Sequence, residues 1–158
     1  MDIAQAAEQF LTKSRIAVTG VSRTSEGHGS NAIYVRLRDR GYHVVAVNPS
    51  ADEVEGDPCH HDLKSIPGGV DAVVIGTRPE HALGTMRECV ELGIGMVWMH
   101  RAFGDGSVSD AATAHGREHG VVVIDGGCPL MFGDASDGFH RLMKPVCTWA
   151  GKVPREVA

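Results

Sequence analysis

Short apolar runs recur along the chain and alternate with stretches that have helical spacing. The runs are bounded by Gly, Asp or Asn, and they lie at residues 16–19, 44–47, 72–76, 95–99 and 121–124. Their near-continuous apolarity is typical of strands that are buried on both faces of a sheet. Helical patterns fall between them, at residues 31–40, 79–92 and 107–119, and a glycine follows each one.

This alternation predicts an α/β fold. Parallel strands joined by right-handed helical crossovers build a doubly wound, Rossmann-like sheet. A short turn at residues 62–67 separates the second and third long strands, and an edge strand is expected before it, near Cys59. We therefore expect a mostly parallel sheet of about five to six strands, with ligands bound beyond the carboxyl ends of the strands.

The loop after the first strand is rich in glycine and hydroxyl side chains. It runs over residues 20–30 with the sequence Gly-Val-Ser-Arg-Thr-Ser-Glu-Gly-His-Gly-Ser. Glycines let the backbone approach an anion closely, and the hydroxyls of Ser22, Thr24 and Ser25 can donate to phosphate oxygens. The helix that follows presents free N–H groups at its positive end. The loop therefore predicts a phosphate-binding site.

The loop departs from the dinucleotide-binding fingerprint in two respects. Ser22 stands where Gly-x-Gly-x-x-Gly requires its second glycine. The second strand ends in Asn48-Pro49-Ser50 and lacks the acidic residue that binds a ribose hydroxyl in that fingerprint. A nicotinamide or flavin dinucleotide is therefore disfavoured, and another phosphate-bearing ligand stays open.

Length and composition fit one globular domain over residues 1–158, because 42% of the residues are hydrophobic and 22% are charged. A net charge of −5 argues against a nucleic-acid surface, which needs a broad basic face. No apolar run is long enough to cross a bilayer, and the amphipathic, acidic start of the chain is unlike a signal peptide. We expect a cytoplasmic protein whose four cysteines, none in a C-x-x-C pair, are reduced.

Five motifs at the expected carboxyl edge of the sheet carry a resemblance to a known family. In chain order they are Gly-x-Ser at 20–22, Asn-Pro at 48–49, Arg-Pro-Glu at 78–80, Val-Trp-Met at 97–99 and Cys-Pro at 128–129. Over residues 12–130 the chain resembles the coenzyme A-binding domain family, the single-domain relatives of the amino-terminal domain of the succinyl-CoA synthetase alpha subunit. The resemblance implies a Rossmann-like domain that binds coenzyme A with its pyrophosphate on the first loop.

The resemblance also implies ligand contacts at matching positions. These form a phosphate-contacting stretch, a loop that flanks the adenosine end, and a loop near the nucleotide or pantetheine. In that order the residues are Gly20, Ser22, Arg23, Thr24 and Ser25; Asn48, Pro49 and Ser50; and Thr77, Arg78 and Pro79. His100 matches a position where the family more often carries Gln. The second domain of the synthetase subunit, which supplies its phosphorylated histidine, has no counterpart, so no complete ligase is expected.

Coenzyme A carries a 3′-phosphate and a pyrophosphate, so an acidic protein needs localised cations to hold it. Arg23, Arg78 and Arg101 fall on the ligand-side loops, and Arg23 is the strongest candidate. Residues 59–62, Cys-His-His-Asp, are of metal-binding types. Adjacent side chains on an extended segment point in different directions, however, so no metal site is expected there.

Residues 131–158 form an extension beyond the resembling region. Apolar residues recur in it near helical spacing, and Pro145 interrupts the pattern. We expect a helical segment that packs back on the domain or on a partner, either a second copy or an acyl-CoA enzyme.

More than one class of function stays open. A stand-alone or accessory module that binds coenzyme A or an acyl-CoA is favoured, because no full set of nucleophile, base and orienting group is present. The alternative is an enzyme of acyl-CoA or thiol chemistry that uses Cys128 with His100 as its base. A weaker alternative is an NAD(P)-binding regulator, which the missing acidic residue after the second strand disfavours.

Overall fold

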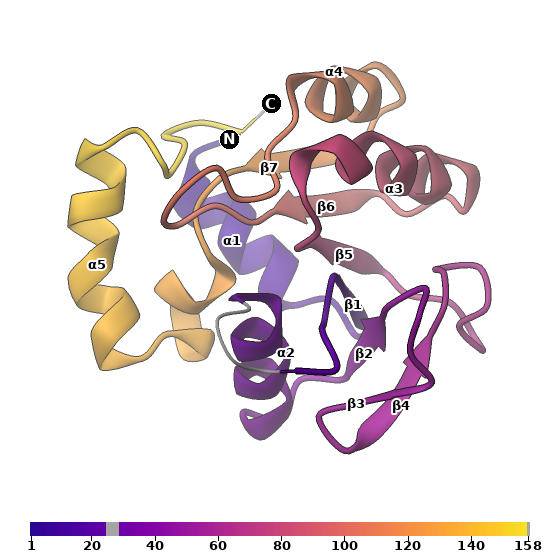
Figure 1. Ribbon diagram of the computed structural model, residues 1–158. Helices are drawn as coiled ribbons and strands as arrows, with labels where there is room; N and C mark the ends of the chain where they lie inside the picture. Colours follow the sequence, from indigo (N-terminus) through magenta and orange to yellow (C-terminus); the bar gives the residue numbers. More distant parts are fainter. Residues whose placement is uncertain (25–28, 158) are drawn as a thin grey trace.

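The computed structural model describes residues 1–24 and 29–157 (Figure 1). The helices are α1 (Ile3–Leu11), α2 (Gly29–Asp39), α3 (Pro79–Glu91), α4 (Asp110–Glu118) and α5 (Gly138–Trp149), with 3-10 turns η1 (Pro129–Met131) and η2 (Gly133–Ala135). The strands are β1 (Ile16–Thr19), β2 (Val44–Val47), β3 (Glu53–Val54), β4 (Asp57–His60), β5 (Ala72–Ile75), β6 (Met96–Met99) and β7 (Val122–Asp125). Each predicted strand and helix is present, with its ends shifted by a few residues at most.

One sheet contains these strands in the order β3-β4-β2-β1-β5-β6-β7. Neighbours from β4 to β7 pair in parallel, whereas β3 pairs antiparallel with β4 at the edge. The doubly wound, mostly parallel α/β fold is therefore confirmed, and β4 is the edge strand expected near Cys59. The short β3 adds a seventh strand through a tight hairpin in which Glu55 and Gly56 have φ of 51° and 78°.

The central strands are buried on both faces, as their continuous apolarity predicts. In β1, Ile16 and Val18 belong to one core and Ala17 belongs to the other. Helices α1 and α2 and the C-terminal segment cover the first face, and α3 and α4 cover the second (Figure 1). Because helices cover both faces of the sheet, the loops that can form a binding site meet at its carboxyl edge.

The order of the strands reverses between β1 and β5. From β1 the chain turns to β2 and β4 on one side of the sheet, and it then returns to β5, β6 and β7 on the other side. The crossovers on the two sides leave a gap beyond the ends of β1 and β5, which is where ligands bind in sheets of this kind.

Trp98 in β6 joins the sheet to the elements at both ends of the chain. Its ring is fully buried and lies 5.4 Å from the ring of Phe10 in α1 and 5.5 Å from the ring of Phe132. The indole Nε1 donates a hydrogen bond of 2.8 Å to the backbone oxygen of Gly126. The Val-Trp-Met motif is thus a packing motif that also fixes the loop leading to Cys128.

The C-terminal extension returns to the domain. Helix α5 corresponds to the predicted helical pattern, and it packs against η1 at the left in Figure 1. Cys147 is buried on its inner face, whereas Leu142 and Trp149 on its outer face are 74% and 89% exposed. The tail then reaches the start of the chain, where the backbone N–H of Val157 donates to the oxygen of Met1 at 2.8 Å.

Candidate functional site

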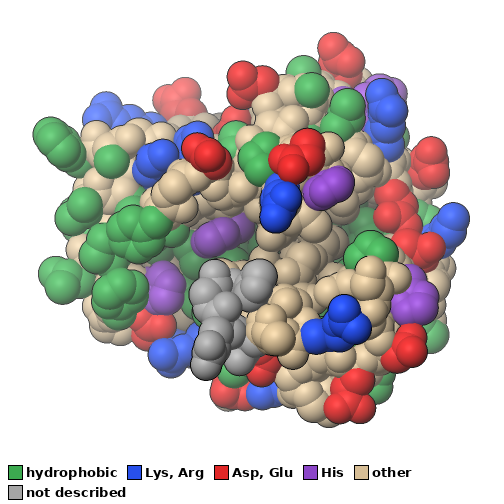
Figure 2. All heavy atoms as spheres, in the orientation of Figure 1, with side chains coloured by type: hydrophobic (Ala, Val, Ile, Leu, Met, Phe, Trp, Pro, Cys, Tyr) green, Lys and Arg blue, Asp and Glu red, His purple; other side chains and the backbone are tan. Residues whose placement is uncertain are grey.

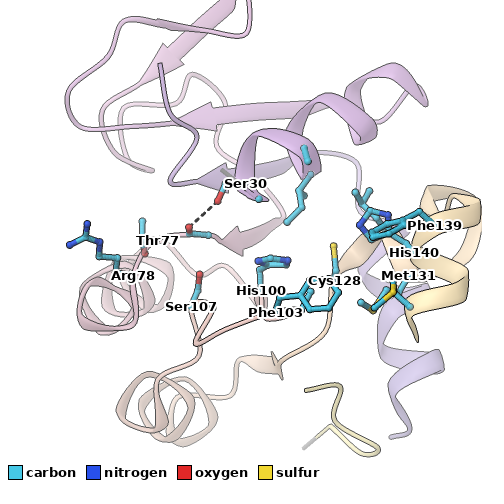
Figure 3. A pocket seen from close by; sticks show the side chains of 18 residues that line it. Ser30, Thr77, Arg78, His100, Phe103, Ser107, Cys128, Met131, Phe139 and His140 are labelled. Atoms are coloured by element: carbon cyan, nitrogen blue, oxygen red, sulfur yellow. Dashed lines mark hydrogen bonds between the residues drawn. The ribbon is translucent and has the colours of Figure 1, made fainter. Parts of the chain in front are cut away.

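Two glycines at the switch between β1 and β5 bring three backbone segments together. Gly20, which follows β1, has a φ of 76°, and a Cβ there would lie 2.6 Å from the carbonyl oxygen of Gly76. A Cβ on Gly76, which follows β5, would clash with the hydroxyl of Ser30. That hydroxyl donates to Gly76 O at 2.9 Å (Figure 3). Because Gly20 and Gly76 carry no side chain, the amino end of α2 can pack against the ends of β1 and β5.

The described part of the first loop is held by Asn31 of α2. The Asn31 side chain accepts a hydrogen bond of 2.8 Å from the N–H of Ser22 and donates one of 2.8 Å to the Ser22 oxygen. The Ser22 hydroxyl accepts from the N–H of Thr24 at 3.2 Å, which closes a local turn. Arg23 at the tip of this turn is exposed. Ser25, predicted to contact phosphate, lies outside the described residues.

The second predicted loop is tied to the first. Asn48 donates from Nδ2 to the backbone oxygen of Val21 at 2.8 Å, and its Oδ1 accepts from the N–H of Ser50 at 2.8 Å. The Asn48 side chain therefore links the two loops through backbone groups. Pro49 and Ser50 are exposed, and Pro49 borders a small cavity of 310 Å³ together with Thr77 and His81.

A larger cavity of 560 Å³ opens on the other side of Thr77. It is bounded by the amino end of α2, by the loops after β5, β6 and β7, and by α5 (Figure 3). Residues from each of these elements line it, among them Ser30, Thr77, His100, Cys128, Met131 and Phe139. In the space-filling view, hydrophobic side chains gather at the left of the molecule, over α5 (Figure 2). The size is within the range of small-molecule and cofactor sites.

Thr77 stands between the two cavities and borders both. Its Oγ1 is buried and makes no hydrogen bond with any part of the chain that the structure describes. A buried hydroxyl without a partner costs about 1–3 kcal/mol, so an additional acceptor or donor at this point is favourable. The next residues, Arg78 and Pro79, begin α3, and the exposed Arg78 side chain borders the larger cavity.

His100 and Cys128 both face the larger cavity in their neutral forms. Burial, together with the nearby His140, lowers the pKa of His100 from 6.5 to about 4. The His100 ring lies against the first residue of α2, since a Cβ on Gly29 would be 3.3 Å from His100 Cε1. Burial raises the pKa of Cys128 to about 12. At neutral pH the pair therefore provides neither a thiolate nor an imidazolium.

The structure separates the three candidate arginines. Arg23 and Arg78 are exposed beside the first loop and the larger cavity, as the sequence predicts. Arg101 also contacts the C-terminal tail, because its Nη2 donates to the backbone oxygen of Gly151 at 3.2 Å. Arg101 thus holds the C-terminal tail.

The sequence reasoning missed Asn31, which shapes the first loop, and Phe103, Phe139 and Met143, which line the larger cavity. Phe139 and Met143 did show as helical apolar positions, but the pattern alone carries no sign of a cavity. In residues 59–62, His61 Nε2 lies 2.8 Å from Asp52 Oδ1. No group of three or more His, Cys, Asp or Glu residues suited to a metal occurs within residues 1–24 and 29–157.

Comparison with known proteins matches most of the chain to one family. A model described as "CoA binding domain" matches residues 14–134. An uncharacterized protein, YneT, of Bacillus subtilis is 31% identical over 118 residues, which are 74% of this chain and 84% of the relative. The alpha subunit of an ADP-forming acetate–CoA ligase II of Pyrococcus furiosus is 31% identical over 100 residues. That match spans 62% of this chain but only 22% of the ligase subunit.

Solved structures show the same fold. A hypothetical protein from Pyrococcus horikoshii superposes with a TM-score of 0.73 at 23% identity, over 80% of this chain and 87% of that chain. A conserved hypothetical protein from Pyrococcus furiosus gives a TM-score of 0.60 at 30% identity, over 69% of this chain and 90% of that chain. Helix α5 lies beyond the region that the family model matches.

Proposed function

The chain belongs to the family of CoA binding domains, and from that premise we propose that it binds coenzyme A or an acyl-CoA at the carboxyl edge of its sheet. The observation that carries the proposal is the meeting of Gly20, Gly76 and the amino end of α2 between two cavities. An anion placed there faces the amino end of α2, where the positive end of the helix dipole favours negative charge.

The ligand's parts are assigned by the chemistry of the surroundings. Its pyrophosphate lies on the first loop, where Ser22, Arg23 and Thr24 supply hydroxyl and guanidinium donors. Its adenosine end lies by Asn48-Pro49-Ser50 and the smaller cavity, and its pantetheine arm crosses Thr77 into the larger cavity. The unpaired Thr77 hydroxyl suits an amide of that arm. Arg78 is the second cation at the rim.

Binding without covalent chemistry is the better-supported function. A cysteine nucleophile needs a thiolate and an effective base. Burial raises the pKa of Cys128 to about 12, and the lowered pKa of His100, about 4, makes its imidazole a weak base. An NAD(P)-binding regulator is less well supported, because the residue after β2 is Asn48, whose side chain is hydrogen-bonded to backbone groups. The proposal is therefore a binding or accessory module rather than an enzyme.

Partners and location belong to the same proposal. None of the described helices has both the length and the apolar character needed to cross a membrane. All four cysteines are free and buried, which suits the reducing cytoplasm. A partner, either a second copy or an acyl-CoA enzyme, would meet the exposed apolar face of α5 around Leu142 and Trp149.

The test is titration calorimetry with coenzyme A, dephospho-coenzyme A and NAD. Coenzyme A should bind most tightly. Replacing Arg23 by Ala should weaken that binding by about 1.5–3 kcal/mol, the range for a hydrogen bond to a charged group. The matched control is Arg87→Ala, which removes an exposed arginine on α3 that borders neither cavity and should leave the affinity unchanged. Tighter binding of NAD, or equal loss in both variants, would overturn the assignment.

A further inference from the structure

The larger cavity changes in character from one end to the other. Thr77 and Arg78 lie at the end that joins the phosphate-binding loops, and Met131 and Phe139 lie at the opposite end, against α5 (Figure 3). His100 and Cys128 lie between them. A ligand that fills this space must be polar at one end and apolar at the other.

The residues at the floor of the apolar end of the cavity are buried. Leu130 has no exposed surface, and Cys128 and Met131 are each 2% exposed. Burial keeps His100 neutral and Cys128 protonated at neutral pH, with pKa values of about 4 and about 12. An acyl group that carried its own carboxylate would lose its hydration here, which is costly. His140 on the wall offers no unpaired charge to offset this cost, because its Nδ1 lies 2.8 Å from Asp137 Oδ1.

Helix α5 supplies one wall of this end through Phe139, His140 and Met143. The helix is fixed at its start by Asp137, whose Oδ1 accepts from the N–H of His140 at 2.8 Å. It is fixed near its end by the buried Cys147, whose Sγ lies 3.7 Å from Ala102 O. The wall is therefore part of the folded domain, although it lies outside the residues that the family model matches.

Two phenyl rings border the cavity and remain open to solvent. Phe139 on α5 and Phe103 in the segment after β6 are each 62% exposed. Exposed phenyl groups at the rim of an apolar cavity gain stability when an apolar ligand covers them.

We propose that the larger cavity is an acyl pocket and that the preferred ligand is a coenzyme A thioester of an uncharged, apolar acyl group, with α5 setting this preference. This proposal rests on coenzyme A binding, because the thioester enters the cavity at the end of the pantetheine arm. Each methylene buried in the pocket should strengthen binding about fourfold, the equivalent of the transfer of one methylene from water.

The experiment compares coenzyme A with acetyl-, butyryl-, octanoyl- and succinyl-CoA by titration calorimetry on the full chain. Affinity should rise along the apolar series, with octanoyl-CoA at least about tenfold tighter than coenzyme A and succinyl-CoA no tighter than acetyl-CoA. Phe139→Asp should bring the ratio of octanoyl-CoA to coenzyme A affinity close to one. Its control is Leu142→Asp, which adds the same charge to the exposed outer side of α5 and should keep the wild-type ratio.

The outcomes separate the two proposals. If coenzyme A binds but its thioesters bind equally well, or if succinyl-CoA binds most tightly, the acyl pocket is refuted while coenzyme A binding stands. If Leu142→Asp lowers the ratio of octanoyl-CoA to coenzyme A affinity as much as Phe139→Asp does, the effect comes from added charge anywhere on α5. The specific role of Phe139 in the cavity wall is then refuted. If no member of the series binds, both proposals fail. Circular dichroism of each variant confirms that α5 still folds, and the wild-type series decides the question even if one variant does not.

Discussion

At the scale of single residues, His100 should couple stability to pH. Burial lowers its pKa from 6.5 to about 4, so between these values the unfolded chain binds more protons than the folded one. The free energy of unfolding therefore rises with pH across this window, by up to about 1.4 kcal/mol per pH unit from His100. The same contribution is lost as the pH falls from 6.5 towards 4. Urea denaturation of His100→Gln from pH 4.5 to 7 should show a shallower dependence than the wild type.

The comparison needs a histidine that does not face the cavity. His43 is exposed just before β2, so His43→Gln should retain the wild-type pH dependence. Equal slopes in the wild type and in His100→Gln would show that the imidazole is solvated in the folded chain. In that case His100 could act as a base towards Cys128, and the enzymatic alternative would gain support.

At the scale of elements, the joint between β1, β5 and α2 depends on Gly20. An alanine there has to adopt a φ of 76°, which costs about 1–2 kcal/mol, and its Cβ also meets the Gly76 carbonyl. Gly41, which follows α2, has a φ of 86°, but a Cβ there meets nothing within 4 Å. Gly20→Ala should therefore lose at least about 1 kcal/mol more than Gly41→Ala in urea denaturation. Equal losses would mean that the joint adjusts without cost.

These elements were largely predictable, because periodicity and helix-ending glycines are local signals. The carboxyl edge followed from them, so the positions of Ser22, Asn48 and Thr77 could be predicted. The β3 hairpin was missed because its first left-handed residue is Glu55, a residue type that gives no turn signal. The contact of Arg101 with the C-terminal tail and the place of α5 in the cavity wall could not be predicted. Both depend on residues far apart in the chain, and the pattern of one sequence does not show which of these come together.

At the scale of the whole molecule, the C-terminal tail supports the floor of the larger cavity. Val153 is 3% exposed and packs over Gly127, whose N–H donates to the oxygen of Lys152 at 2.7 Å. Cys128 follows directly and faces the cavity. The tail continues to the backbone bonds between Val157 and Met1 that join the two ends of the chain. Weakening the tail should therefore loosen the Cys128 loop before the rest of the domain.

Alkylation of buried thiols by iodoacetamide can measure this local opening. Val153→Ala removes two buried methyl groups, worth about 1.5 kcal/mol, so the Cys128 loop should open and react about tenfold more often. Cys89 is the internal control, because its pKa is also raised to about 12 and it is fully buried in the other core, on the inner face of α3. Peptide mass spectrometry should show faster labelling of Cys128 and an unchanged rate at Cys89. Equal acceleration at both thiols would mean that Val153 stabilises the domain as a whole. The tail would then not stabilise the Cys128 loop separately from the rest of the domain.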